Sequence, residues 1–222
     1  MTDALGSKQG SLFSILRYIR TFFLVFAPSR PWGNWGRIYI LLKCGKKQAQ
    51  NDGTIKRDVH FPLGLSDYIY SGPHFSIANP LFQASQQGCN THRAFDNIDL
   101  NAIPVDYMQR CNYSPACDME EYFRRVPKTP WGDAYTDCYR IIVRRMLNQS
   151  GERTLIPAII PPHVGHVHTV FGFAFHDPQD LVSVAGSMSS LVFDGFIKIT
   201  GRSDLYFETA SNFPYLVGPQ LQ

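Results

Sequence analysis

Apolar and polar residues alternate between residues 167 and 175, and this period of two predicts a β-strand. One side would carry Val167, Thr169, Phe171, Phe173 and Phe175, and the other His168, Val170, Gly172 and Ala174. The apolar run 154–160 predicts a second strand, and Pro157 places it at a sheet edge or a bulge because proline donates no backbone hydrogen bond. With 161–166 as the connecting loop, we expect a hairpin whose tip carries histidines.

The pattern changes to the helical period after residue 176. Asp177 suits the N-cap of a helix, Pro178 suits its first turn, and Gly201 suits its end. Apolar residues recur at spacings of three and four, at Leu181, Ala185, Met188, Val192, Phe196 and Ile199. We expect one helix over 178–200 that buries this stripe against the sheet.

Two shorter segments place basic residues near one another in sequence. Asp118 is followed three residues later by Glu121, which predicts a capped helix ending before Pro127, with Arg124, Arg125 and Lys128 near its C-terminal end. These cations would also complement the helix dipole. The segment 139–147 fits a strand or a helix, and both periods put Arg140 and Arg144 on a common side.

The N-terminal part differs from the rest of the chain. An apolar segment over 12–26 is interrupted by Arg17 and Arg20, so its uninterrupted apolar stretch is too short to span a bilayer. The polar run 46–58 is typical of a linker. We therefore expect residues 1–55 to form an apolar arm and linker that serve as a docking element, and residues 56–222 to form the main domain. We expect that domain to have a mixed α/β (α+β) fold, a twisted and mainly antiparallel sheet flanked by helices.

Composition limits the number of cores, the kind of partner and the cellular compartment that we expect. A chain of 222 residues with 44% hydrophobic and 14% aromatic residues buries one substantial core, and its net charge of +3 neither requires nor excludes a polyanionic partner. The five cysteines are odd in number and form no CxxC pair, so they do not form a secreted disulfide framework. We expect a protein of the reducing cytoplasm, with no membrane partner.

The candidate chemistry is sparse. His163, His166 and His168 have a spacing that could place two imidazoles on one zinc ion, but a metal site needs a third or fourth ligand, such as His176 or Asp177. The sequence has no GxSxG, HExxH, Walker or GxGxxG motif. The segment 79–82, Asn-Pro-Leu-Phe, lacks the second proline of the methyltransferase catalytic tetrapeptide, so we interpret it as structural. The sequence thus predicts no catalysis by this chain alone.

Four blocks, in order, nevertheless resemble one family. They are DYIYSGPHFSIANPLFQ (67–83), the stretch from IDLNAIPV to KTPWG (98–132), the stretch from TDCYRIIVRRML to GHVHTV (136–170), and SLVFDGFIKITG with the residues that follow it to 219. They resemble the C-terminal half of large adenine-N6 DNA methyltransferases of the type II restriction-modification and phage-growth-limitation type. The most specific parts are ERTLI..IIPP and S.VFD...K.TG.

The resemblance implies a function. In that family this half is the target-recognition domain, whereas the other half holds S-adenosylmethionine and the catalytic loop; the present chain lacks that catalytic half. It would therefore carry no cofactor itself and would act with a methyltransferase catalytic domain or subunit, either as a fragment of such an enzyme or as a separate specificity subunit. The implied partner is double-stranded DNA, read in a sequence-specific way.

DNA recognition needs cations for phosphates and planar polar groups for base edges. Our candidates for phosphate contact are Arg124, Arg125, Lys128, Arg140, Arg144, Arg145 and Arg202; those for base or sugar contact are Asn112, Tyr113, His163, His166 and His168. We expect Arg153 instead to pair with Glu152 or a helix end. Two alternatives stay open: a small metal-dependent hydrolase built on the three histidines, and a non-catalytic protein-interaction module.

Overall fold

The computed structural model describes residues 38–41, 46–76, 83–86, 91, 94–97, 99–206, 209, 210 and 213. The apolar segment 12–26, the tetrapeptide 79–82 and the last residues of the closing block lie outside the described residues.

The largest sheet among the described residues has four antiparallel strands in the order β1-β10-β7-β8. Its strands are β1 (Ile38–Leu41), β7 (Arg140–Arg144), β8 (Pro157–Ile160) and β10 (Val170–Phe175). The helices α5 (Pro178–Ser189) and α6 (Leu191–Thr200) pack against it, and their apolar side chains share one core with Phe171, Phe173 and Phe175. The predicted α+β fold, with antiparallel sheets flanked by helices, is confirmed.

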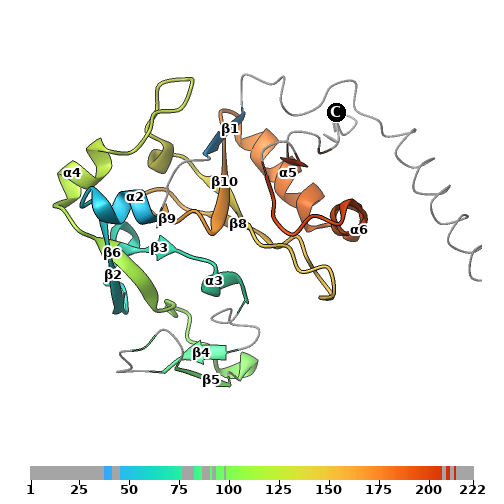
Figure 1. Ribbon diagram of the computed structural model, residues 1–222, viewed down its shortest axis with the longest axis horizontal. Helices are drawn as coiled ribbons and strands as arrows, with labels where there is room; N and C mark the ends of the chain where they lie inside the picture. Colours follow the sequence, from blue (N-terminus) through green and yellow to red (C-terminus); the bar gives the residue numbers. More distant parts are fainter. Residues whose placement is uncertain are drawn as a thin grey trace, which may run out of the picture.

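Smaller elements surround this sheet. They are α2 (Lys46–Asn51), β2 (Ile55–His60), β3 (Ile69–Tyr70), α3 (Pro73–Ser76), β4 (Gln83–Ser85), β5 (Phe95–Asn97), β6 (Cys111–Pro115), α4 (Met119–Arg124) and β9 (Gly165–His166), with 3-10 turns at Leu65–Asp67, Leu100–Ala102 and Tyr135–Asp137. β2 pairs with β6 and β4 with β5, both antiparallel, whereas β3 and β9 are parallel. Figure 1 shows α2 and α4 at one end of the molecule and α5 and α6 at the other, with β8 and β10 between them.

Several local predictions are confirmed because they depend on neighbouring residues alone. Asp118 accepts a hydrogen bond from the Glu121 amide at the start of α4 (2.8 Å), and Asp177 accepts one from the Gln179 amide at the start of α5 (2.9 Å). Gly201 ends α6 in the left-handed conformation, with φ of 63°. Pro157 lies in β8, an edge strand of the described sheet.

The predicted hairpin is wrong. β8 and β10 do not pair with each other, because β7 lies between them and hydrogen-bonds to both. The segment 161–169 is therefore a crossover rather than a tight turn, and it forms β9 on the way. β10 is an interior strand and is buried on both faces. Phe171, Phe173 and Phe175 face the helices. On the other face, Val170 packs in the apolar cluster of Tyr68, and Ala174 packs in that of Tyr135.

The single helix predicted over 178–200 is also wrong. The chain bends by 67° at Ser190, whose backbone is extended and whose hydroxyl accepts a hydrogen bond from the Phe193 amide. The bend shifts the phase of the apolar stripe, so Phe193 and Ile197 are buried while Val192 and Ile199 are exposed. No single helix in the described part of the chain has the length and apolar composition needed to cross a bilayer.

The expected linker is structured instead: residues 46–51 form α2 and 55–60 form β2. β1 adds an edge to the main sheet, so the described residues before position 55 pack with the elements that follow them.

Gly165 in β9 provides a test of this packing. A Cβ at this position would overlap the Tyr122 hydroxyl, whereas the Tyr122 ring carbon Cζ lies 3.6 Å away. We expect Gly165→Ala to lower the free energy of unfolding by about 1–3 kcal/mol through overpacking, and Tyr122→Phe in the same chain to recover part of that loss. Urea unfolding measures both. Gly186→Ala is the control, because a Cβ in that exposed position of α5 meets nothing within 4 Å; an equal loss there would contradict the packing argument.

Candidate functional site

Four of the candidate contact residues are buried. The exposed fraction is 6% for Asn112, 5% for Tyr113, 0% for Arg140 and 7% for His166. β6 and β7, which carry three of them, have their side chains covered by neighbouring elements. In this conformation these four side chains lie beyond the reach of a duplex.

The three histidines do not come together around one point. His163 is exposed and lies 3.7 Å from an Asp137 oxygen, and its ring contacts Phe123. His166 is buried, with its Nε2 3.3 Å from the Tyr135 hydroxyl, while His168 is partly buried. Among the described residues no group of three or more His, Cys, Asp or Glu side chains could hold a metal ion. The hydrolase alternative therefore gains no support from the described histidines.

Two cations at the end of α4, Arg124 and the C-cap residue Arg125, share one carboxylate. Arg124 Nε lies 2.5 Å from one Glu121 oxygen and Arg125 Nε 2.6 Å from the other. These bonds from Arg124 and Arg125 lower the pKa of Glu121 to about 2. Arg125 also donates to the Asp52 carbonyl and the Thr54 hydroxyl, both at 2.9 Å, which fastens α4 to the α2–β2 turn. This pair thus has a structural role, while Lys128 nearby is exposed.

A second basic group lies at the far end of β7. The backbone of 145–147 runs beside 203–205, where Leu147 N–H donates to Ser203 and Leu205 N–H donates to Arg145, both at 2.8 Å. This pairing brings Arg202 to the same part of the fold as Arg144 and Arg145, although they are far apart in sequence. Arg145 lies 3.9 Å from an Asp204 oxygen, whereas Arg144 and Arg202 form no ion pair with any described residue.

A polar turn lies beside this group. The Asn148 side-chain oxygen accepts from both the amide and the hydroxyl of Ser150. Lys198 of α6 donates to the carbonyls of Gly151 and Glu152, both at 2.8 Å. Figure 1 shows this β7–β8 loop, in yellow, projecting from the body of the molecule next to α6. The sequence predicts a turn here, but no pattern in it pointed to Asn148 and Ser150 as contacts.

Like Lys198, Arg153 holds the loop in place. It donates to the Ser189 carbonyl at the end of α5 (2.8 Å) and lies 3.5 Å from an Asp194 oxygen. The helix-end alternative predicted for Arg153 is therefore confirmed. The arginines at the β7 end stand next to a loop that two helices hold in place.

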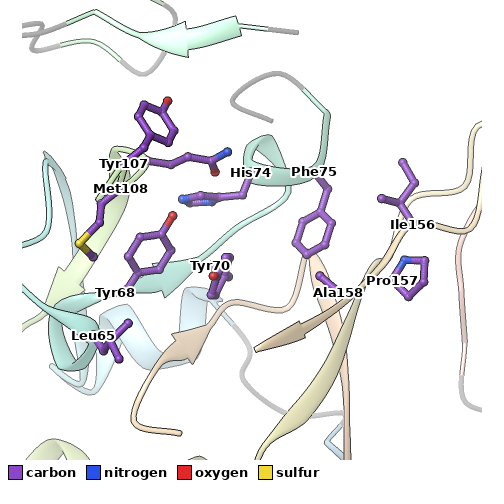
Figure 2. A pocket seen from close by; sticks show the side chains of 11 residues that line it. Leu65, Tyr68, Tyr70, His74, Phe75, Tyr107, Met108, Ile156, Pro157 and Ala158 are labelled. Carbon is purple, nitrogen blue, oxygen red and sulfur yellow. The ribbon is translucent and has the colours of Figure 1, made fainter. Parts of the chain in front are cut away.

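A pocket of about 400 Å³ lies beside the start of β8, and no sequence pattern pointed to it (Figure 2). Its lining is largely aromatic and apolar and consists of Leu65, Tyr68, Tyr70, His74, Phe75, Tyr107, Met108, Gln109, Ile156, Pro157 and Ala158. Burial lowers the pKa of His74 to about 4 and raises the pKa of Tyr68 and Tyr70. These lining groups are thus neutral at pH 7, so the pocket suits an uncharged apolar group.

Comparisons with protein-family models, with curated proteins and with solved structures find no match for this chain. The family resemblance therefore rests on the four sequence blocks, and the choice of a site rests on the geometry described above.

Proposed function

We propose that this protein binds double-stranded DNA in a sequence-specific way, as the recognition part of an adenine-N6 DNA methyltransferase system whose catalytic part, with S-adenosylmethionine, is a separate domain or subunit. The observation that carries the proposal is the grouping of Arg144, Arg145 and Arg202 beside the projecting 148–153 loop. Arginines without a carboxylate partner suit phosphates, and an asparagine in a projecting turn suits base edges.

We call these three arginines and the 148–153 loop the DNA surface, and their contacts suit them to different parts of the DNA. Arg144 and Arg202 have no ion pair among the described residues, so binding a phosphate would not require breaking one. Arg145 is partly held by Asp204 and by the ring of Tyr206. The Asn148 oxygen is engaged by Ser150, which leaves its amide nitrogen as the group for an acceptor on a base edge.

Salt dependence tests the phosphate contacts. Three phosphate contacts predict that the logarithm of the binding constant falls with the logarithm of salt concentration at a slope of about −3. The variant Arg144→Gln/Arg202→Gln should lower the slope to about −1 and weaken binding roughly 50-fold at 0.1 M salt. Fluorescence anisotropy with a labelled duplex measures both quantities.

The matched control is Arg124→Gln/Lys128→Gln, which removes the same charge from the α4 end. It should change the affinity by less than about threefold, because a distant exposed cation acts only through screened, long-range attraction. Equal losses in both variants would contradict this surface, and a wild-type protein without measurable DNA binding would favour the protein-interaction alternative. Selection from a pool of random duplexes then tests whether binding is sequence-specific.

A further inference from the structure

Arg140, the first residue of β7, is a buried cation without a carboxylate partner. Its side chain is 0% exposed, and it forms no ion pair with any described residue. Its Nε donates to the Cys138 carbonyl (3.2 Å) and its Nη2 to the Val164 carbonyl (2.5 Å). The guanidinium also lies over the Tyr135 ring, 4.8 Å from the centroid.

These contacts compensate the charge only in part. Two carbonyl dipoles and a ring face offset some of the cost of taking a guanidinium out of water, but a buried charge is normally balanced by an opposite charge. Burial lowers the pKa of Arg140, and the neighbouring Tyr135 works against this. An arginine nevertheless remains protonated at neutral pH. The remaining nitrogen, Nη1, makes no hydrogen bond to the described residues.

A cavity adjoins this guanidinium and is lined by residues of α2, β2, β3, α4, β7 and β9 and of the turns next to them. Its volume is about 70 Å³, and a single buried water needs only about 10–15 Å³ measured in this way. The lining residues are Ala49, Thr54, Ile55, Ile69, Tyr122, Arg125, Val126, Pro127, Tyr135, Thr136, Arg140, Gly165 and His166. Of the two arginines in this described lining, Arg125 is paired with Glu121, and Arg140 is the one without a carboxylate partner among the described residues.

Further donors converge on the cavity. The hydroxyl of Thr136 is buried, with 4% of the residue exposed, and has no hydrogen-bond partner among the described residues. His166 and Tyr135 contribute an imidazole and a phenol that contact each other. Arg125 is exposed and Thr54 is partly buried, so both lie at its solvent side, where Arg125 Nη1 donates to the Thr54 hydroxyl (2.9 Å).

We propose that this cavity binds a small tetrahedral oxyanion, such as inorganic phosphate or the terminal phosphate of a phosphomonoester, with Arg140 as the main binding residue. One oxygen would accept from Arg140 Nη1 and another from the Thr136 hydroxyl, whereas Arg125 stays paired with Glu121 and does not hold the anion. This site is separate from the DNA surface proposed above, which uses residues at the opposite end of β7.

The test titrates the full chain with sodium phosphate, and in parallel with sodium chloride at equal ionic strength, while thermal unfolding and the arginine Nε–H signals in NMR spectra are followed. We expect a saturable rise in Tm with phosphate alone, together with a shift of the Arg140 signal. Arg140→Lys, which loses the planar fork, should weaken phosphate binding at least about tenfold. Equal responses to phosphate and chloride in the wild type would overturn the proposal.

Two further variants keep the test decisive if Arg140→Lys does not fold. Thr136→Val is close in shape and removes only the hydroxyl, so we expect phosphate binding to weaken about three- to tenfold. Arg145→Lys is the control at the DNA surface and should bind phosphate like the wild type. Unchanged binding in Thr136→Val, or equal weakening in Arg145→Lys, would contradict the site. Phenyl phosphate distinguishes the sources: tighter binding than inorganic phosphate indicates the terminal group of a larger ligand, and weaker binding indicates the free ion.

Discussion

Acidification from pH 8 to pH 5 is expected to lower the free energy of unfolding by about 4 kcal/mol through two buried histidines, His74 and His166. Burial lowers the pKa of His74 to about 4, and burial together with the Arg140 charge lowers the pKa of His166 to about 3. Both imidazoles are therefore neutral in the folded chain throughout this range.

The sign follows from where the protons bind. In the unfolded chain both imidazoles titrate near pH 6.5, so below that pH the unfolded state binds two protons that the folded state excludes. Stability from this source is fully present above pH 6.5 and is lost as the pH falls towards 4 for His74 and 3 for His166. Each histidine contributes about 2 kcal/mol at pH 5.

Urea unfolding at half-unit pH steps in a phosphate-free buffer measures the effect. His74→Gln and His166→Gln should each halve the slope of stability against pH, whatever each substitution does to stability at pH 8. His163→Gln is the matched control, because it makes the same substitution at an exposed histidine. A slope that is the same in all four proteins would show that these imidazoles are not the acid-sensitive groups.

Much of the local structure could be predicted because its causes are local. A cap such as Asp118 and an end signal such as Gly201 act within one helical turn, and both are where the sequence indicates. The aromatic face of β10 follows from a period of two over consecutive residues. The pairing of strands could not be predicted in this way, because β7, β8 and β10 are all apolar and several orders bury them equally well.

The burial and the neighbours of single side chains in the candidate site could not be predicted either. Arg140 and Arg144 lie on one side of β7, as the period predicts, yet one is buried and the other is partly exposed. The difference arises from the turn at Tyr135–Asp137 and the crossover at 161–169, which cover the Arg140 end of the strand. Likewise, nothing local places Arg202 beside Arg145; the backbone pairing of 145–147 with 203–205 does.

The contact between α6 and residues 153–155 depends on the Asp194 carboxylate. Asp194→Ala is therefore expected to lower the free energy of unfolding by about 3–5 kcal/mol. Asp194 is 3% exposed, and one of its oxygens accepts from the amides of Thr154 (2.8 Å) and Leu155 (2.7 Å). Burial alone would raise the pKa of Asp194. The hydrogen bonds from these two amides and the charge of Lys198 outweigh burial, so the pKa lies below its usual value. Alanine would leave both amides without their acceptor and would remove the carboxylate that pairs with the cations of Arg153 and Lys198.

Asp204→Ala provides the comparison, because Asp204 makes a longer and more exposed ion pair with Arg145 and should cost less than about 1 kcal/mol. Urea unfolding at pH 8 measures both variants, and equal costs would contradict the role assigned to Asp194. Since Asp194 fixes residues 153–155, at the base of the projecting loop, its loss should also weaken DNA binding under conditions where the variant remains folded. Loss of stability with undiminished DNA affinity would instead separate the anchor from the proposed contact surface.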